Sequence, residues 1–311
     1  MRWSDRIGRR IKLRDLHVLH AVLEAGSMSK AAEQLAVSVP VVSKAIADLE
    51  HTVGVRLLDR SPQGVEATMY GRALLPRSLA AFDELRQGVN ELEFLADPTA
   101  GEVRIGSTVP LAASFVSVVI DRLSRRNPRI VFHVLAAESE TLYRDLSDRE
   151  VDFLIARKWP VKDEHLAFET LYHDPYVVAA GAANRWARRR SIKLAELVNE
   201  LWALPPPDSL VGSFVIEAFR ASGLDLPRAT VFTFPYEVRN SLLATGRYLT
   251  VLPSSVLRFP AKHPFIKALR VQLPIVGEPI GIFTWKTRTL SPVAELFLDC
   301  ARQVAKALAG R

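Results

Sequence analysis

The chain is poor in cysteine and in long apolar runs, and each absence excludes a class of protein. Its 311 residues include one cysteine, Cys300, so no internal disulfide can form and a reducing, cytoplasmic location is expected. No apolar run reaches about 18 residues, the length that spans a membrane, so no membrane partner is expected. The N-terminal stretch MRWSDRIGRRIKLRD has charge but no apolar core, so we expect no secretory signal.

Catalytic motifs are also missing. The nucleophile elbow G-x-S-x-G, the phosphate loop G-x-x-x-x-G-K-[ST] and the dinucleotide fingerprint G-x-G-x-x-G do not occur. The histidines show no complete metal-ligand spacing, and Cys300 lies in the apolar pattern LFLDCARQV, which is typical of a core position. We therefore expect neither an enzyme nor a bound metal or cofactor.

Positive charge is abundant, and it is uneven. The net charge is +7, which suits a polyanionic partner. Residues 1–14 hold six basic residues and one acidic residue, a net charge of +5. These are Arg2, Arg6, Arg9, Arg10, Lys12 and Arg14, against Asp5. This segment is either a basic arm that lies along a phosphate backbone or a solvated tail.

Two short helical patterns follow each other closely over 28–36 and 39–53. Ser27 and Ser38 stand where N-caps are expected, and an apolar helix over 13–25 precedes them. A break of two residues forces a steep crossing, which the small residues of both patterns permit. This arrangement is typical of a helix-turn-helix, whose second helix presents its N-terminal end to the major groove. An ordinary helical hairpin with a serine-rich exposed face is the alternative.

The stretch over 13–61 resembles the N-terminal domain of LysR-type transcriptional regulators. The resemblance rests on AGSMSKAAEQL, on the helix S-x-P-x-x-S-K-x-I-x-x-L-E and on GVRLLDR, which corresponds to a wing. It implies double-stranded operator DNA as a partner. The residues that it places at or near DNA are Ser27, Ser29, Lys30, Ser38, Val39, Pro40, Ser43, Lys44, Arg56 and Arg60.

The chain departs from the family at Val39, where glutamine is common. Valine cannot hydrogen-bond a base edge, but it can contact a thymine methyl group. Lys44, Arg56 and Arg60 are expected to neutralise phosphates, with ordinary surface charge as the alternative for the two arginines. The start of the linker helix, ATMYG, also replaces a more usual threonine-acidic turn.

The sequence predicts one long helix over 71–96. Leu75, Phe82 and Val89 recur every seven residues, and Leu85 and Leu92 fill the intermediate positions of the heptads. Such a seam favours a partner helix, although the stripe can instead pack on its own domain. The family resemblance implies that this helix dimerises the protein and that a tetramer forms. The helix pattern is then broken by ADPTAGE. Residues 97–102 of this stretch are the predicted hinge.

Strand and helix patterns alternate after the hinge and restart near residue 173, which predicts two α/β lobes built on parallel sheets. This topology resembles the LysR effector-binding domain, itself similar to periplasmic binding proteins. The predicted fold class is thus multidomain α+β. Its parts are a basic arm and winged helix-turn-helix (1–70), a dimerisation helix (71–96), a hinge (97–102) and an effector domain (103–311). Lobe one spans 103–172 and 275–311, and lobe two spans 173–274.

Ligands of open α/β sheets bind at the carboxyl ends of strands, where helix N-termini point N–H groups outward. Polar side chains near those ends are therefore candidates for binding an effector, a small polar metabolite such as a sugar or an organic acid. They are Ser107, Thr108, Ser139, Arg157, Asp208, Ser209, Ser213 and Arg247. The alternative role for the serine and threonine pair at 107–108 is to cap a helix.

These features together predict a sequence-specific DNA-binding transcriptional regulator controlled by a small metabolite. A solute-binding protein without a DNA role is the alternative, which the helix-turn-helix disfavours.

Overall fold

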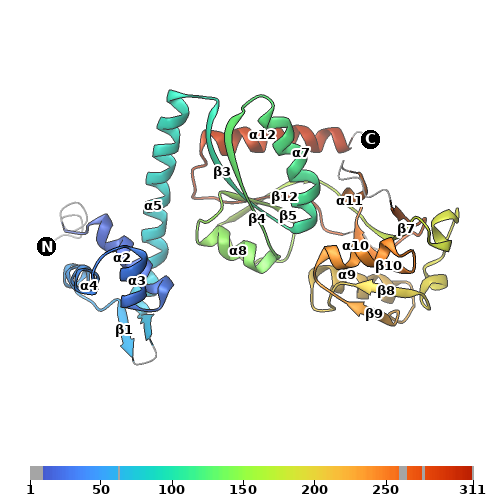
Figure 1. The fold of residues 1–311 in the computed structure, drawn as a ribbon, viewed down its shortest axis with the longest axis horizontal. Coiled ribbons are helices and arrows are strands. Elements are labelled where there is room, and N and C mark those ends of the chain that lie inside the picture. The colour runs from blue at the N-terminus through green and yellow to red at the C-terminus, as the bar shows by residue number, and fades with distance from the viewer. Residues whose placement is uncertain (1–9, 62–63, 259–264, 275–276, 310–311) are drawn as a thin grey trace. The chain divides into compact units, whose positions relative to one another are not determined.

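The computed structural model describes residues 10–61, 64–258, 265–274 and 277–309, and most of the predicted basic arm lies outside them. The chain divides inside its longest helix into two compact units, Met1–Arg86 and Gln87–Arg311. Figure 1 shows the helices and strands of both units.

The first unit is a small three-helix head with a two-stranded wing. Its elements are α2 (Leu13–Ala25), α3 (Met28–Gln34), α4 (Val39–Val53), β1 (Leu58–Ser61) and β2 (Gly64–Ala67), followed by the start of α5 (Met69–Ala96). Apolar residues of the three helices form one core, which Leu57 and Leu58 close from the wing. β1 and β2 pair antiparallel. The predicted ranges 13–25 and 39–53 are confirmed.

The turn between the two short helices is longer than predicted. α3 ends at Gln34, not near residue 36, and four residues precede α4. The reason is Ala36, whose φ of 53° is left-handed and cannot continue a helix. The N–H of Val37 reaches back to the carbonyl of Ala32 at 2.9 Å, which satisfies the end of α3.

Helix α5 begins on a threonine cap. Thr68 Oγ1 accepts a hydrogen bond from the N–H of Gly71 at 3.1 Å and donates one to the carbonyl of Arg56 at 2.7 Å. The unusual ATMYG turn therefore still caps the helix and ties it to the residues before the wing. The helix continues through Pro76 and Gly88 to Ala96.

Gly71 lets α5 approach the wing, and we expect its replacement by alanine to destabilise the head. A Cβ at Gly71 would lie 2.2 Å from the carbonyl oxygen of Leu57, so the backbone must shift. Such overpacking typically costs about 1–3 kcal/mol. Chemical denaturation of Gly71→Ala measures the loss. Gly88→Ala on the same helix is the control, because a Cβ there has nothing within 4 Å and should stabilise the helix by roughly 0.5–1 kcal/mol. Equal changes in the two variants would contradict this account.

The hinge is shorter than the predicted 97–102. α5 ends at Ala96, and β3 (Ala100–Ser107) begins after only three intervening residues. Its first residues already pair with β4, Ala100 with Arg129 and Glu102 with Val131. Asp97 Oδ1 accepts hydrogen bonds from the N–H and the hydroxyl of Thr99 at 3.0 and 2.8 Å, which fixes the tight turn.

Lobe one is built on a five-stranded sheet in the order β4-β3-β5-β12-β6. Its strands are β3, β4 (Arg129–Ala136), β5 (Phe153–Arg157), β6 (Leu166–Tyr172) and β12 (Ile280–Trp285). Its helices are α6 (Val109–Leu111), the π-helical η1 (Ala112–Val116), α7 (Ser117–Ser124), α8 (Ser139–Ser147) and α12 (Pro292–Ala309). β3, β4 and β5 are parallel, whereas β12 pairs antiparallel with β5 and β6. The prediction of a parallel sheet is thus wrong for the strands next to the lobe crossings.

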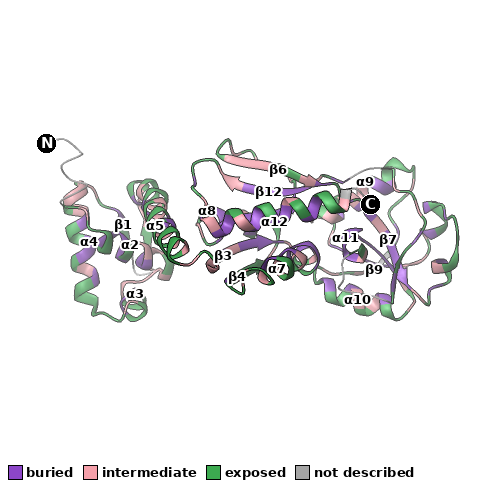
Figure 2. Ribbon diagram, turned by 90° about the horizontal axis from the view of Figure 1, so that it is seen from above, coloured by how far each residue is buried: buried purple, intermediate pink, exposed green. Residues whose placement is uncertain are grey.

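Strand alternation divides the side chains of this sheet between two cores. Phe153 and Ile155 point to the core under α7 and α12, and Leu154 and Ala156 point to the core under α8. α12 is accordingly buried along one side and exposed along the other (Figure 2). Cys300 is buried in the first core, as predicted.

Lobe two is likewise built on a five-stranded sheet, in the order β11-β7-β10-β8-β9. Its strands are β7 (Tyr176–Gly181), β8 (Leu201–Leu204), β9 (Ala229–Phe232), β10 (Tyr248–Pro253) and β11 (Ile266–Ala268). Its helices are η2 (Arg185–Arg188), η3 (Leu194–Leu197), α9 (Leu210–Ala221), α10 (Tyr236–Ala244) and α11 (Ser255–Arg258). α9 packs in one core and α10 in another, so the two helices lie on opposite faces of the sheet.

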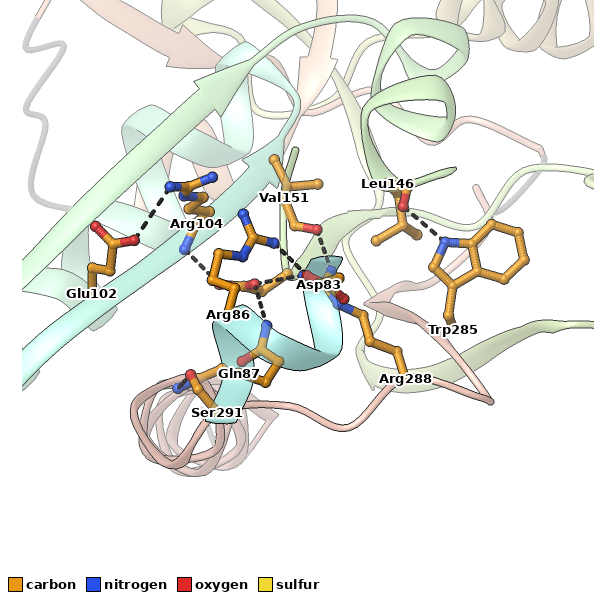
Figure 3. Close-up of polar contacts among 12 residues, drawn as sticks. Asp83, Arg86, Gln87, Glu102, Arg104, Leu146, Val151, Trp285, Arg288 and Ser291 are labelled. Atoms are coloured by element: carbon orange, nitrogen blue, oxygen red, sulfur yellow. Dashed lines mark hydrogen bonds and ion pairs between the residues drawn. The ribbon is translucent and has the colours of Figure 1, made fainter. Parts of the chain in front are cut away.

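Polar contacts hold the last turns of α5 on lobe one. Asp152 accepts hydrogen bonds from the N–H of Arg104 at 2.8 Å and from Arg288 Nη2 at 2.8 Å, and Gln87 Nε2 reaches it at 3.5 Å. Arg288 also donates to the carbonyl of Val151 (Figure 3).

Candidate DNA-contacting surface and inter-lobe site

The residues predicted to contact DNA form an exposed set on the head. Ser29, Lys30, Ser38, Val39, Pro40, Lys44, Arg56 and Arg60 are exposed, and Ser27 and Ser43 are half-buried. Val42, Ile46 and Leu49 of α4 are buried in the head core. The N-terminal end of α4 therefore presents polar and basic groups outward while its other side holds the core.

The two predicted serine caps are right in position and wrong in mechanism. Ser27 and Ser38 occupy the N-cap positions of α3 and α4 with extended backbone, but neither side chain makes a capping hydrogen bond. The backbone carbonyl of Ser38 still accepts from the N–H of Val41 at 3.0 Å. Both hydroxyls consequently remain available to another partner on the surface that holds Lys44.

Glu50 fixes the wing, a role that was not predicted from the sequence. Its Oε1 accepts hydrogen bonds from the N–H groups of Leu57 and Leu58, at 2.7 and 3.1 Å. This bond joins the last turns of α4 to the start of β1, and so positions Arg56 and Arg60 relative to α4. An acid at the end of the helix, a few residues before a glycine turn, is the signal that could have indicated it.

Three exposed valines surround the start of α4. Val37, Val39 and Val41 are 40, 41 and 43% exposed, a concentration of apolar surface that folding does not require. Apolar side chains at a major groove can contact thymine methyl groups. Val39 was predicted in this role, and Val37 and Val41 extend the same surface.

The two lobes present the same kind of edge to each other. In lobe one the strands β3, β4 and β5 end together, and in lobe two the strands β8, β9 and β10 end together. The charge of Asp208 acts on Glu138 from the opposite lobe, so the loop after β4 lies near the loop after β8. Burial, Glu140 and Asp208 raise the pKa of Glu138.

Three of the predicted effector-binding residues make side-chain hydrogen bonds of 3.0 Å or less within the fold. Ser107 is fully buried and donates to the carbonyl of Ile155 at 2.7 Å, which joins β3 to β5. Ser209 caps α9 by accepting from the N–H of Gly212 at 3.0 Å. Arg157, buried at the end of β5, pairs with an acid as predicted, but the acid belongs to the chain: Asp174 lies at 3.7 Å.

The other five candidates are less constrained. Thr108 is half-buried at the N-cap of α6 without a side-chain capping bond, so the alternative capping role is not observed. Ser139 is the first residue of α8 and is half-buried. Asp208 and Arg247 are exposed. Ser213 lines a hollow on α9 together with Glu217 and Arg220, all residues of one helix, so this hollow is not an inter-lobe site.

A buried cluster around Asp174 joins the chain segments that cross between the lobes. Its carboxylate accepts from the hydroxyls of Ser254 and Ser255 at 2.9 and 2.6 Å and from the N–H of Ser255 at 2.9 Å. Arg157 donates to the carbonyls of Asp174, at 2.7 Å, and Glu278. The end of β5 is thereby tied to both segments that cross between the lobes and, through Asp174, to the start of α11.

The Arg157 guanidinium also lies over the ring of Tyr176, 4.3 Å from its centroid. Burial raises the pKa of the Tyr176 phenol, which the charge of Arg157 opposes. Tyr176 is the first residue of β7, so this stacked pair belongs to the same crossing region.

A winged helix-turn-helix head, a long helix and a two-lobed domain are the parts of a DNA-binding transcriptional regulator with an effector-binding domain. The family model for the LysR substrate binding domain matches residues 96–306, and the model for the bacterial regulatory helix-turn-helix protein of the lysR family matches residues 13–72. The chain belongs to the LysR family of DNA-binding transcriptional regulators.

Individual relatives cover nearly the whole chain. The transcriptional regulator GbpR of Azospirillum brasilense is 29% identical over an alignment of 310 positions, which covers 94% of this chain and 86% of that protein. TdcA of Escherichia coli is 26% identical over 293 residues, 94% of this chain and 93% of that protein.

The fold also matches solved structures of full-length regulators. CbnR bound to its target DNA superposes with a TM-score of 0.56 and 22% identity, over 95% of this chain and 100% of that chain. OxyR of Pseudomonas aeruginosa superposes with a TM-score of 0.67 and 19% identity, over 95% of each chain. Identities this low show a shared fold and nothing finer. Among the residues that the structure describes, no helix is both long and apolar enough to cross a bilayer.

Proposed function

We propose that the protein binds an operator through α4 and its wing, and that a small polar metabolite between the two lobes controls this binding. The observation that carries the proposal is the exposed, polar and basic N-terminal end of α4 on a packed helix-turn-helix. Ser38, Ser43 and Lys44 supply donors there, and Arg56 and Arg60 supply charge from the wing side. Ser27, Ser29 and Lys30 complete the contact from α3. The protein acts where its DNA is, in the cytoplasm.

Thymine methyl contacts are the proposed mode of base reading at the start of α4. Val39 has no hydrogen-bonding group, and Val37 and Val41 on either side are equally exposed. Lys44, Arg56 and Arg60 provide the phosphate contacts, which fix register without reading sequence. The operator is therefore expected to carry A·T pairs beneath the end of α4.

Self-association through α5 supplies the second head. Leu85, Val89, Leu92 and Leu95 are 52 to 70% exposed along the last turns of the helix. Phe82, also part of the predicted seam, packs instead on the core of its own head. A paired helix would cover the exposed stripe, and two heads would then contact two half-sites of an approximate palindrome. A tetramer, as a dimer of dimers, is the proposed assembly.

The effector-binding part of the proposal centres on Thr108, Ser139 and Asp208. They lie at strand ends or helix starts on the facing edges of the lobes, and their side chains are not committed to capping. Sugars and organic acids suit such hydroxyl and carboxylate groups. Ser213 lies one turn into α9 and Arg247 lies in the turn before β10, so both are secondary candidates.

A salt series of DNA binding to the region upstream of the protein's own gene tests the DNA-binding role. We expect a footprint over an interrupted palindrome that weakens steeply with salt, because phosphate contacts release counterions. A folded, dimeric protein without any sequence-preferring complex would contradict the proposal and favour a solute-binding protein.

Two variants test the division of labour between the units. Ser43→Ala combined with Lys44→Ala should abolish the footprint while leaving ligand binding intact, because these groups lie on the exposed end of α4. Thr108→Val should do the reverse, since it removes one hydroxyl and retains the shape. Footprinting and ligand titration of both variants form the experiment. An unchanged ligand response in Thr108→Val would show that the effector site lies elsewhere.

A further inference from the structure

The residues that the structure describes include three buried arginines, and only two of them have a carboxylate partner. Arg157 lies beside Asp174, and Arg288 donates to Asp152 at 2.8 Å. Arg239, on α10, is 7% exposed and forms no ion pair within the described chain. Its one hydrogen bond is a long one, from Nη1 to the carbonyl of Val251 at 3.4 Å, and its Nε has no partner.

Among the described residues no acid forms an ion pair with this charge; Glu237 acts on it only from a distance, raising the pKa of Arg239 less than burial lowers it. Glu237 is two residues away on the same helix and exposed, and residues two apart on a helix do not face each other. The Tyr236 ring lies 5.6 Å from the guanidinium, a weaker partner than a carboxylate. Burial lowers the pKa of Arg239, yet an arginine stays protonated in proteins. An uncompensated buried cation destabilises a fold, so its presence requires a reason.

The position of Arg239 strengthens the need for a negatively charged partner. It lies in the first turns of α10, at the end of a helix that already carries partial positive charge. Pro235 occupies the N-cap and has no side-chain group that can accept from the helix N–H groups. A cation and an uncapped helix start both favour an anion at the same place.

This place is the inter-lobe edge of lobe two. α10 follows directly on the carboxyl end of β9, which lies at the same edge as the ends of β8 and β10. Helical side chains lean toward the helix N-terminus, and therefore toward that edge. The charge of Arg239 acts on the phenol of Tyr176, the residue over which Arg157 stacks. Arg239 thus lies close to the segments that cross between the lobes.

We propose that Arg239 and the N-terminus of α10 bind the carboxylate of the effector, so that the ligand is an organic acid and not a neutral sugar. This inference rests on the proposed function of the inter-lobe edge as the effector site. A carboxylate fits better than a phosphate, because Glu138 and Asp208 near the same edge oppose a second negative charge. Bound there, the carboxylate gives Arg239 the partner that Arg157 and Arg288 already have within the fold.

Thermal unfolding of the full chain without DNA tests the proposal, using one substitution at all three arginines. Arg239→Met should raise the melting temperature by about 2–4 °C, because it removes an unpaired buried charge at similar volume. Arg157→Met and Arg288→Met should lower it, because each leaves a buried carboxylate without its cation. A lower melting temperature for Arg239→Met would overturn the proposal, since it would reveal a partner inside the fold.

The second arm adds sodium salts of malonate and gluconate, inorganic phosphate, neutral glucose, and sodium chloride at matched ionic strength. We expect at least one carboxylate to raise the melting temperature of the wild type and not that of Arg239→Met. Equal rises in both proteins, no rise with either carboxylate, or a rise with phosphate or glucose alone would each reject a carboxylate site at Arg239. Failure of DNA binding would appear only in the footprint, so it cannot be confused with these outcomes.

Discussion

Replacing Asp174 by alanine is expected to lower the stability of the effector domain by about 3–5 kcal/mol, the cost of breaking a buried ion pair from one side. Asp174 is 2% exposed, and it accepts hydrogen bonds from Ser254 and Ser255 beside the charge of Arg157. Its removal leaves the guanidinium without an anion and the two hydroxyls without an acceptor. Because domains are stable by only about 5–15 kcal/mol, the melting temperature should fall by roughly 10 °C.

Asp121→Ala is the matched control for this experiment. Asp121 pairs with Arg125 at 2.9 Å, a geometry as good as that of the buried pair, but both side chains are exposed. Surface pairs of this kind contribute about 0–1 kcal/mol. Thermal melts of the two variants therefore separate burial from pairing. A loss in Asp174→Ala no larger than in Asp121→Ala would show that the crossing segments are held by other contacts.

Helix α4 is the part of the fold that local sequence determines most completely. A serine N-cap, Pro40 in the first turn and apolar residues at spacings of four and three all lie within 39–53, and the observed α4 has these bounds. The turn before α4 was less predictable. Nothing in LAVS indicates that Ala36 adopts a left-handed conformation, because alanine rarely does.

Strands that depend on distant partners were missed. β6 pairs only with β12, more than a hundred residues later in the chain, and β11 pairs only with β7. β11 has no turn residues directly after it that would separate it as a strand from sequence alone, whereas β6 lies between Asp163 and the pair Asp174–Pro175. The antiparallel pairing of β12 was likewise unpredictable, since alternating strand and helix patterns do not indicate where a crossing strand inserts.

The inter-lobe site was predicted at the level of its edges and not of its contacts. Ser107, Arg157 and Ser209 are polar residues at strand ends or helix starts, as the rule requires, but Ser107 and Arg157 bond to distant segments of the fold and Ser209 caps its own helix. The chemistry of a serine does not indicate whether its hydroxyl will donate a hydrogen bond to a carbonyl of the fold, as Ser107 does to Ile155, or to a ligand. Asp174 and Arg239 were missed for the converse reason, since their burial depends on chain segments far away in sequence.

Introducing charge into the exposed stripe of α5 is expected to dissociate the protein and to weaken its DNA binding by at least about 10²-fold. Val89→Glu with Leu92→Glu places two carboxylates where we propose that a partner helix packs, and burying them unpaired is costly. The two half-sites would then be bound by separate heads, which loses the effective-concentration advantage of linked binding. Sedimentation gives the oligomeric state, and footprinting gives the affinity.

Ala73→Glu on the same helix is the control for added charge. Ala73 is exposed but lies off the stripe, so its variant should assemble like the wild type. The double variant retains α4, the wing and every basic residue of the head, so its monomers should still bind DNA weakly and with a shallower salt slope, in proportion to the halved number of phosphate contacts. An unaltered assembly in the double variant would show that α5 does not pair through this stripe. The second head would then have to be supplied through the effector domain.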